Sequence, residues 1–550
     1  PVPPPLPDLE TMATATRVKV TEDESMLTSL VRRITSSSER DGWQEPVLPG
    51  QLTLTIVVAG ASGDLAKKKT YPALCFLYQH GFLCSNVRIV GYARTDLSDQ
   101  ALRDKLRPFL KNTPEDKREA FLATCSYVSG PYDTPHGWQR LAAVLDKRES
   151  ATPKNPAGRL FYLALPPSVY PQVCRGLKEH CSSIATSSEP GRSWVRVVVE
   201  KPFGKDLQSS EDLAEHLGEL YPEEQLYRID HYLGKEMTQN MFVMRFANTF
   251  LSPLWSRTHV ANVQITFKED FGTQGRGGYF DEFGIIRDVI QNHLIQLLAF
   301  VGMEKPVSLH PDDIRDQKVQ VLRCIKPPSL DNVVLGQYTA ADGEDGYLDD
   351  PTVPQGSRTP TFASIVLYID NDRWAGVPFI IKAGKALDER KAEIRIQLHE
   401  TPHFIFAGES SSSRNELVVR LQPDEAIYMK FIVKKPGLDT EPVISELDLD
   451  YHSRYPDVII PDAYPKLILD AIRGDQQHFV RRDELRAAWA IFTPLLHAVD
   501  AGEVPIHPYP YSSRGPEEAD ALRSRVGWVK NSKYDWKAKV DVPARSGSRL

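Results

Sequence analysis

The chain has 550 residues, enough for several domains of ordinary size and for an enzyme with separate cofactor and substrate regions. Apolar residues make up 41% and charged residues 25%, and 66 basic against 73 acidic side chains give a net charge of −7. This mildly acidic balance argues against bulk electrostatic binding to nucleic acid or to an anionic membrane surface, so we expect neither partner. No apolar run has the length of a transmembrane helix.

Residues 1–50 differ in composition from the rest of the chain. Five prolines among the first seven residues disfavour a helix or a central strand, and predict polyproline II or disorder. Apolar residues from Met26 to Ile34 recur near helical spacing and predict one short amphipathic helix. We therefore expect residues 1–50 to be an extension whose helix packs on the body or on a partner.

From Leu52 the pattern alternates between strand and helix. Apolar runs typical of buried parallel strands cover residues 52–59, 87–92, 160–165 and 195–199, and helical patterns cover residues 65–78 and 169–177. This order predicts an α/β domain over residues 51–230, with a Rossmann-like, doubly wound parallel sheet.

Beyond residue 230 the strand pattern becomes a strict alternation of apolar and polar residues. It covers residues 261–268, 394–398 and 427–431, and predicts a mainly antiparallel sheet with one apolar and one polar face. One helix is expected over residues 280–301, and a surface loop over residues 343–359. Residues 231–550 are thus expected to form a larger α+β domain for substrate binding and oligomerisation.

The six cysteines show neither a disulfide framework nor the spacing of a zinc site, so we expect no metal and a reducing compartment. Cys174 and Cys181 lie seven residues apart in an expected helix and could share a face. We interpret them as ordinary thiols.

A glycine-containing turn follows the first expected strand directly. Gly60 allows a tight turn, Gly63 lets a pyrophosphate approach the backbone, and the following helix directs its N-terminus at the phosphates. A structural turn without a ligand is the alternative, but the strand and helix around it favour dinucleotide binding. The predicted cofactor residues of this turn are Gly60, Ser62, Gly63, Asp64 and Leu65.

The end of the second expected strand predicts which dinucleotide binds. Arg94 can pair with a 2′-phosphate, and Ser62 and Thr95 can donate hydroxyl hydrogen bonds to it, which favours NADP. Asp96 nearby leaves NAD as an option, and the alternative for Arg94 is a solvated surface arginine.

Two further motifs carry basic side chains. Lys201, in Glu200-Lys201-Pro202, follows a buried strand and is expected to point into the ligand crevice at its carboxyl end, where it could bridge cofactor and substrate. The donors of His231, Tyr232 and Lys235 lie within about one helical turn and suit the oxygens of a phosphomonoester. A network at a domain interface is the alternative for these three residues.

Three segments, in this order, resemble the glucose-6-phosphate dehydrogenase family: residues 60–69 (GASGDLAKKK), 228–236 (RIDHYLGKE) and 277–293 (GGYFDEFGIIRDVIQNH). The similarity covers roughly residues 52–540. It implies oxidation of glucose 6-phosphate at C1 to 6-phosphogluconolactone, with hydride transfer to NADP, in the oxidative pentose phosphate pathway. It also implies that His293 is the general base and that Asp230 orients it. By its position in the sequence alone, His293 would be read as a core histidine.

The resemblance implies further site residues. The substrate contacts are His231, Tyr232, Lys235, Lys201, Glu269, Asp288, Lys385, Arg390 and Gln422, and Tyr170 and Lys201 line the nicotinamide side of the coenzyme. A second, structural NADP is implied near Lys391, Arg395, Arg420, Tyr428, Lys430, Asp448, Arg514 and Trp536. Lys382 and Lys530 replace the arginine and tyrosine of family members that bind this NADP, so a solvated sheet face or a dimer contact is the alternative.

Other readings remain open at this point. Another NADP-dependent sugar dehydrogenase would share the glycine turn and Lys201, and a catalytically silent NADPH sensor would be expected to lose His293 or Asp230. We expect a homodimer or homotetramer in the cytoplasm. The C-terminal Ser548-Arg549-Leu550 is similar to a peroxisomal signal and predicts an additional, glycosome-like location.

Overall fold

The computed structural model of the chain describes residues 52–529, apart from residues 85, 152–155, 185–192, 407–413 and 439–441. The expected extension with its short helix, Lys530, Trp536 and the C-terminal tripeptide therefore lie outside the described residues. Among the residues that are described, none of the helices has the length and apolar character needed to cross a bilayer.

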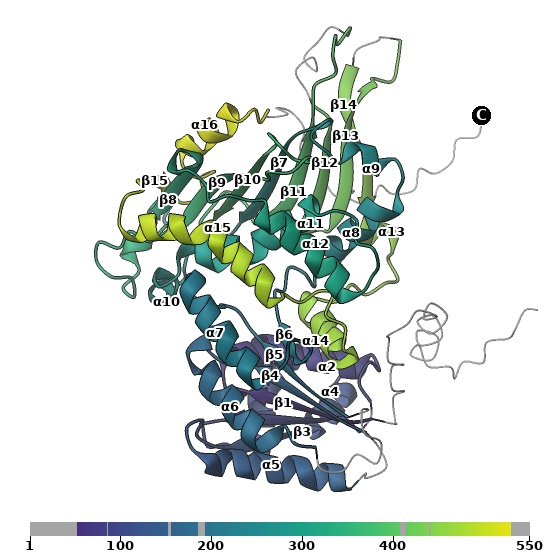
Figure 1. Cartoon of the computed structure of the whole chain (residues 1–550), viewed down its shortest axis with the longest axis vertical. Coiled ribbons are helices and arrows are strands. Elements are labelled where there is room, and N and C mark those ends of the chain that lie inside the picture. Colours follow the sequence, from purple (N-terminus) through teal and green to yellow (C-terminus); the bar gives the residue numbers. More distant parts are fainter. Residues whose placement is uncertain are drawn as a thin grey trace, which may run out of the picture.

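Six parallel strands form the first sheet, in the spatial order β3-β2-β1-β4-β5-β6 (Figure 1). They are β1 (Thr53–Ala59), β2 (Arg88–Ala93), β3 (Cys125–Ser129), β4 (Ala157–Leu163), β5 (Trp194–Val199) and β6 (Leu226–Arg228). The four predicted apolar runs are β1, β2, β4 and β5; β3 and β6 are too short and too polar to show such a run. The strand order reverses between β1 and β4, which places a ligand crevice at the carboxyl ends of these strands.

Helices cover both faces of this sheet. Successive side chains of β1 therefore point to opposite faces and pack into two different apolar cores. Ile56 and Val58 pack with α2 (Tyr71–Gln79) and α14 (Ala463–Arg473), whereas Val57 and Ala59 pack with α5 (Pro135–Ser150) and α6 (Tyr170–Cys181). This is why the strand reads as a continuous apolar run rather than an alternation. The helices of this part are η2 (Ala66–Thr70), α2 (Tyr71–Gln79), α3 (Asp99–Leu106), η3 (Arg107–Phe109), α4 (Glu115–Ala123), α5 (Pro135–Ser150), η4 (Pro167–Val169), α6 (Tyr170–Cys181), α7 (Leu207–Leu220) and η5 (Glu223–Gln225).

Nine strands form the second sheet, in the order β14-β13-β12-β11-β7-β10-β9-β8-β15. Neighbours are antiparallel except for the pairs β7/β10 and β8/β15, so the predicted mainly antiparallel sheet is confirmed. The strands are β7 (Val260–Lys268), β8 (Val333–Thr339), β9 (Phe362–Tyr368), β10 (Pro378–Gly384), β11 (Lys391–Leu398), β12 (Glu416–Gln422), β13 (Ala426–Lys434), β14 (Pro442–Asp450) and β15 (Ile506–Pro510).

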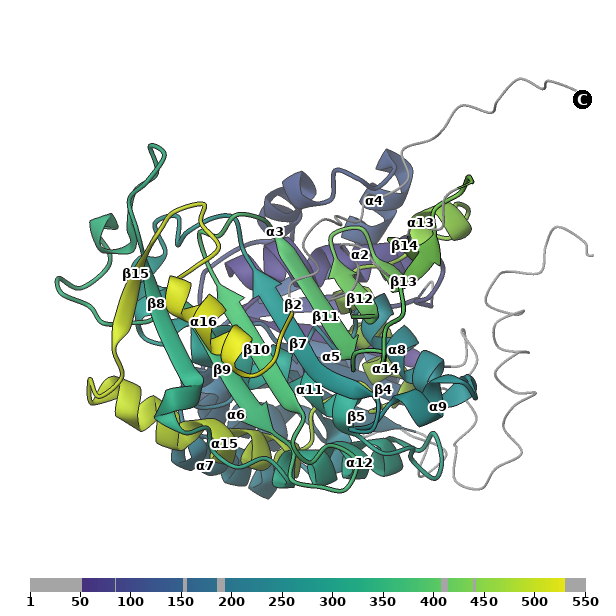
Figure 2. The same cartoon turned by 90° about the horizontal axis from the view of Figure 1, so that it is seen from above.

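One face of the second sheet packs on a large layer of helices, and α16 crosses the opposite face over β8, β9 and β10 (Figure 2). The helices of this part are α8 (Glu236–Ala247), α9 (Leu251–Leu254), α10 (Gly277–Asp281), η6 (Ile286–Leu294), α11 (Ile295–Gly302), α12 (Pro311–Arg323), η7 (Leu330–Asn332), η8 (Tyr347–Asp349), α13 (Tyr451–Arg454), α14 (Ala463–Arg473), α15 (Arg482–Asp500) and α16 (Glu517–Arg525).

The structure adds to one expectation about this second part and corrects another. The polar face of β7 is buried: Asn262 is fully buried and bonds to Gln397, and Lys268 is 7% exposed and bonds to Asp388. The single helix expected over residues 280–301 is interrupted, because Gly284 has a left-handed φ of +68° that a right-handed helix cannot continue. Helix α10 therefore ends before Gly284, and η6 and α11 follow it.

Helix α14 lies beside the first sheet although it comes late in the sequence. Its residues Leu467, Ile468 and Ala471 belong to the same apolar core as α2. The division of the chain at residue 230 stays a prediction, since this later helix packs with the N-terminal part. The packing brings Tyr464, at the start of α14, to the junction of the two sheets.

Candidate active site

A buried, hydrogen-bonded histidine–aspartate pair lies at the junction between the two sheets. Asp230 follows β6, and His293 projects from η6. The His293 Nδ1 and Asp230 Oδ1 atoms are 2.6 Å apart, and each residue is 3% exposed. The Tyr232 backbone N–H donates to the same carboxylate oxygen at 2.9 Å. Because a carboxylate can only accept, Nδ1 carries the proton, which leaves Nε2 as the basic atom of the ring.

The local helix geometry explains why His293 and Asp288 serve one site. The segment Ile286–Leu294 has π-helical i→i+5 bonding, and the two residues are five positions apart. Both side chains therefore lie on the same side of the helix, as is frequent where a π-helical turn forms a functional site. The sequence pattern alone, read with the α-helical period, did not place them together.

The electrostatics of the pair suit proton abstraction. Burial lowers the pKa of His293, although the charge of Asp230 acts to raise it, so the imidazole is neutral at neutral pH. Burial acts to raise the pKa of Asp230, but the interactions with His293, the backbone N–H of Tyr232 and the charge of Lys201 outweigh it and leave this pKa lowered. The site thus holds an ionised carboxylate beside a neutral base.

The predicted phosphate-binding residues lie against this pair. The ring of His231 is 4.4 Å from that of His293, the ring of Tyr232 is 4.8 Å from it, and the Lys235 ammonium is 5.2 Å from the Tyr232 ring. Burial lowers the pKa of His231 well below its usual value, so this ring is neutral. Burial also lowers the pKa of Lys235.

The predicted sugar-binding residues form two ion pairs nearby. Lys201 Nζ donates to Asp288 Oδ1 at 3.0 Å and to the Asp288 carbonyl oxygen at 2.7 Å. Lys385 Nζ pairs with Glu269 Oε2. Burial acts to lower the pKa of Lys201, but the charge of Asp288 outweighs it and leaves this pKa raised. Each of these side chains offers hydrogen-bonding capacity to hydroxyl groups.

Arg390 and Gln422 complete the predicted substrate set. Arg390 acts electrostatically on Tyr232 and Lys235, which places it in the same cluster. Gln422 ends β12 opposite Ala392 of β11, and within the described part of the chain its side chain makes no hydrogen bond to the cluster. Its assignment therefore rests on the family resemblance alone.

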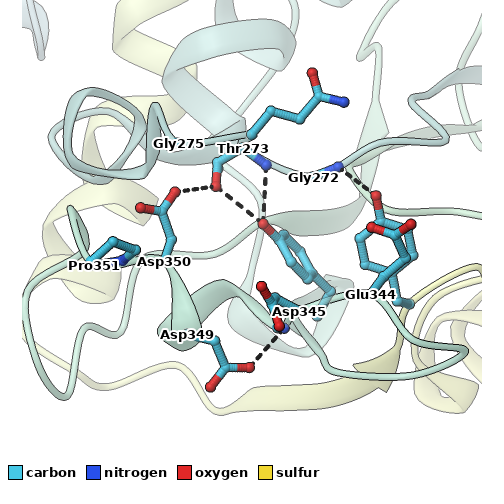
Figure 3. Close-up of a pocket in the computed structure, with 12 residues that line it drawn as sticks. Gly272, Thr273, Gly275, Glu344, Asp345, Asp349, Asp350 and Pro351 are labelled. Atoms are coloured by element: carbon cyan, nitrogen blue, oxygen red, sulfur yellow. Dashed lines mark hydrogen bonds between the residues drawn. The ribbon is translucent and has the colours of Figure 1, made fainter.

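The loop that follows Glu269 is held by hydrogen bonds at Gly272 and Thr273, within a pocket that Asp350 also lines (Figure 3). The Tyr338 hydroxyl accepts from the Thr273 backbone N–H at 3.0 Å, and the Thr273 hydroxyl donates to Asp350 Oδ2 at 2.9 Å. The Tyr511 hydroxyl accepts from the Gly272 N–H at 3.0 Å. These bonds line a cavity of about 220 Å³ and hold the loop in place behind Glu269. The surface loop expected over residues 343–359 includes the short helix η8 and forms one wall of this cavity.

The glycine-containing turn lies at the carboxyl end of β1. The Gly60 N–H donates to the Tyr92 carbonyl oxygen at 2.8 Å, and the Gly63 N–H donates to the Gly60 oxygen at 2.9 Å. Gly60 has a φ of +84°, and a Cβ there would lie 2.4 Å from the Ala164 oxygen, so only glycine fits. Asp64 pairs with Lys67 at 3.0 Å at the start of the helix, which continues through Leu65.

The residues predicted to distinguish NADP from NAD are brought to one place. The Ser62 and Thr95 hydroxyl oxygens are 3.2 Å apart, and the Arg94 guanidinium lies 5.6 Å from the Tyr132 ring. This donor set, two hydroxyls and one guanidinium beside the β1 turn, has the chemistry that a 2′-phosphate requires.

Tyr170 is placed differently from the other predicted coenzyme residues. Its side chain is fully buried, and its hydroxyl donates to the Glu200 carbonyl oxygen at 2.9 Å. This hydrogen bond fixes the backbone just after β5, one residue before Lys201.

Comparison with known proteins identifies the family. Residues 57–240 match the glucose-6-phosphate dehydrogenase NAD binding domain, and residues 242–537 match the glucose-6-phosphate dehydrogenase C-terminal domain. The cytoplasmic glucose-6-phosphate 1-dehydrogenase 6 of Arabidopsis thaliana is 57% identical over 497 residues, 89% of this chain and 94% of the relative. The chain belongs to the glucose-6-phosphate dehydrogenase family.

Other relatives agree. The glucose-6-phosphate 1-dehydrogenase of Takifugu rubripes is 53% identical over 487 residues, 87% of this chain and 90% of the relative. A solved glucose-6-phosphate dehydrogenase in complex with its substrate glucose 6-phosphate superimposes with a TM-score of 0.82 at 46% identity, covering 88% of this chain and 100% of that chain. This member of the family is thus an oxidoreductase of glucose 6-phosphate with a nicotinamide-nucleotide-binding domain.

Sequence reasoning missed two residues that lie beside the predicted phosphate-binding cluster. The charge of Lys69 acts on both His231 and Lys235, and its ammonium lies 5.8 Å from the Tyr464 ring. The Tyr464 ring in turn stacks on His231 at 5.9 Å. Lys69 is the last residue of the segment 60–69 that contains the glycine turn. A lysine about one helical turn beyond the expected phosphate position was the feature of the sequence that could have identified it. Tyr464 had none, because it is about 230 residues from His231 in the sequence.

Six of the residues predicted for a second NADP share one face of the second sheet by strand register: Lys391, Arg395, Arg420, Tyr428, Lys430 and Asp448. Arg395 pairs with Glu393 at 2.6 Å and with Glu416 at 3.1 Å, and Lys430 pairs with Glu416 at 3.4 Å. Lys391 also pairs with Glu393, at 3.4 Å. This face therefore carries the buried carboxylates Glu393 and Glu416 as well as basic side chains.

The remaining second-site residues lie along the same face or near it. Tyr428 pairs in register with Asp448 of β14, and the Arg420 Nε–H donates to the Pro423 carbonyl oxygen at 2.8 Å. Lys382 Nζ donates to the Arg514 carbonyl oxygen at 2.7 Å. Lys382, which replaces the arginine of NADP-binding family members, therefore lies beside Arg514, a residue predicted for the second NADP site.

Proposed function

We propose that this oxidoreductase uses NADP to oxidise C1 of glucose 6-phosphate, with His293 as the base and Asp230 as its orienting partner. The observation that carries this proposal is the buried hydrogen bond between His293 and Asp230, 2.6 Å long, beside a cluster of cationic and hydroxyl donors. His293 Nε2 takes the proton of the C1 hydroxyl, and Asp230 stabilises the imidazolium that forms.

The other residues bind and orient. His231, Tyr232 and Lys235 hold the phosphate, and Glu269, Asp288, Lys385, Arg390 and Gln422 hold the sugar. Lys201 lies between the sugar and the coenzyme. The nicotinamide ring, when bound, accepts the hydride from C1. The product is 6-phosphogluconolactone.

His293→Asn tests this assignment. It preserves the size of the side chain and removes the base, so we expect kcat to fall by about 10²- to 10⁴-fold with little change in KM for glucose 6-phosphate. The readout is absorbance at the reduced-nicotinamide band, and His310→Asn, an exposed histidine, is the matched control. Turnover close to wild type would remove His293 from the mechanism.

The coenzyme preference is proposed from Arg94, Ser62 and Thr95. Arg94→Ala removes the guanidinium, so we expect KM for NADP to rise about tenfold to a hundredfold while KM for NAD stays nearly constant. Arg88→Ala, at the opposite end of the same strand, is the control. Equal weakening of both coenzymes would refute the 2′-phosphate contact. Gly60, Gly63, Asp64, Leu65 and Tyr170 are proposed to shape and support this coenzyme site.

A second, structural NADP is proposed for one face of the second sheet. Lys391, Arg395, Arg420, Tyr428, Lys430, Asp448, Arg514 and Trp536 are its proposed ligands. The support is that the described members share one face or lie next to it; the carboxylates Glu393 and Glu416 already pair with three of the cations. Calorimetric titration distinguishes one from two bound NADP molecules per chain.

Assembly and location are proposed from the exposed surface and from the relatives. A homodimer or homotetramer would cover exposed apolar residues around β13 and β14, of which Leu438 and Leu447 are 103% and 68% exposed. Cytoplasmic residence follows the names of relatives in Arabidopsis thaliana and Solanum tuberosum. An added glycosome-like location through Ser548-Arg549-Leu550 would be lost on deletion of these residues in an N-terminally tagged protein.

A further inference from the structure

Glu200 is a buried carboxyl at the end of β5, one residue before Lys201. Its side chain is 3% exposed, and Oε1 accepts a hydrogen bond from the Tyr162 hydroxyl on the neighbouring strand β4. Lys201 does not neutralise it by direct pairing, because the Lys201 ammonium bonds to Asp288. Ionising a buried carboxyl group that accepts a hydrogen bond from a single hydroxyl costs considerable free energy, because the charge loses its hydration.

The backbone of Glu200 is held as firmly as its side chain. The Tyr170 hydroxyl lies 2.9 Å from the Glu200 carbonyl oxygen, to which it donates, and 3.2 Å from the Glu200 N–H, from which it accepts. Tyr162 and Tyr170 are both fully buried. Two tyrosines from β4 and α6 therefore fix the residue that leads into Lys201.

The charges around Glu200 belong to the active site. The titratable groups that face it are Tyr162, Tyr170, Tyr464, Lys201 and Asp230. Burial raises the pKa of Glu200 to about 7; the hydrogen bond of Tyr162 and the charge of Lys201 act to lower this pKa, and the charge of Asp230 acts to raise it. The pKa of Glu200 therefore depends on the charge of Asp230, the carboxylate that bonds to His293.

We propose that Glu200, held by the hydroxyl groups of Tyr162 and Tyr170, is a positioning residue that fixes Lys201 and whose carboxylate supports the positive charge that His293 acquires during the reaction. Its carboxylate interacts with the charges of Lys201 and Asp230, and a negative charge in this site favours an imidazolium. The inference rests on the proposed role of His293, which the His293→Asn variant tests separately.

Glu200→Gln keeps the shape of the side chain and an acceptor for Tyr162 but cannot ionise. Below about pH 6 the wild-type carboxyl is protonated, so we expect the two enzymes to have similar kcat. Above about pH 8, one unit beyond the pKa of about 7, we expect the variant to be roughly threefold to tenfold slower. A wild-type-to-variant ratio that is constant across pH would show a merely structural role and overturn the proposal.

Tyr162→Phe tests the same idea in the opposite direction and serves if Glu200→Gln does not fold. Removing the hydroxyl removes a hydrogen bond that favours the carboxylate, so the pH at which kcat rises should move upward. The double variant should match Glu200→Gln. Tyr221→Phe, a buried tyrosine of the same region whose hydroxyl bonds to Ser182, is the matched control and should leave the profile unchanged. An unshifted profile in Tyr162→Phe would overturn the proposal.

Discussion

His293 illustrates how burial and one neighbour define a residue's chemistry. Burial keeps its imidazole neutral, and the hydrogen bond to Asp230 fixes its tautomer. The same histidine, read from its helix pattern, would be a core residue. Only the approach of Asp230 from β6, 63 positions earlier in the sequence, gives it a partner.

Lys235 provides a prediction about substrate selection. Lys235→Ala removes a charged donor to the proposed phosphate, so we expect KM for glucose 6-phosphate to rise about tenfold to a hundredfold. Free glucose lacks the phosphate, so its weak turnover should change little and the preference between the two sugars should narrow. The measurement is kcat/KM for both substrates.

Lys326→Ala is the control for this prediction, because Lys326 is 82% exposed and pairs only with Asp370 at the surface in the described chain. It should leave both values unchanged. A Lys235→Ala enzyme with the wild-type preference would show that the phosphate lies elsewhere.

The interrupted helix is the feature of element scale that matters most for the site. Helix α10 stops before Gly284, and η6 then begins with π-helical bonding that aligns Asp288 with His293. Gly284, the residue with a left-handed conformation between α10 and η6, changes the direction of the backbone. A straight α-helix over residues 280–301 would have placed these two side chains differently.

Gly284→Ala is therefore expected to lower the free energy of unfolding by about 1–2 kcal/mol, because an alanine pays a steric cost at a φ of +68°. A Cβ at this position would also lie 3.2 Å from the Thr359 side chain. The measurement is chemical denaturation with and without glucose 6-phosphate.

Gly218→Ala is the matched control for this prediction. Gly218 lies within α7, where a Cβ would meet only the Arg482 side chain at 3.7 Å, so alanine should be neutral or stabilise by up to about 1 kcal/mol. Equal stability of the two variants would contradict a role for the left-handed conformation.

At the scale of the whole molecule, the site exists because two sheets and a late helix meet. Asp230 and Lys201 come from the first sheet, His293 and Glu269 come from the second part of the chain, and Tyr464 comes from α14. Helix α14 packs on α2 through an apolar contact, so its position is set by burial rather than by its place in the sequence.

The outer strands of the second sheet give a prediction about assembly. Leu447→Asp places a charge on an apolar position of β14 that is 68% exposed, so we expect the oligomer to dissociate toward smaller species. Analytical ultracentrifugation measures the mass in solution. Leu309→Asp, at a 62% exposed site before α12, is the control and should keep the wild-type mass. A Leu447→Asp protein of unchanged mass would place the interface elsewhere.

The sequence by itself determined the local features: the buried strands of the first sheet, the glycine turn after β1, the alternating strands of the second sheet and the basic motifs around Lys201 and Lys235. These are set by side-chain periodicity and by backbone preferences that act over a few residues. It also determined the family, because the quoted motifs are long.

Only the tertiary structure decided which of these residues meet. It buried the polar face of β7, broke the helix at Gly284, and placed Lys69 and Tyr464 beside His231. It also buried Glu200 among tyrosines, which makes its carboxyl titrate near neutrality. Such outcomes depend on contacts between residues tens to hundreds of positions apart. Desolvation and ion-pairing energies act on these side chains only in the folded chain, where they are buried and have partners.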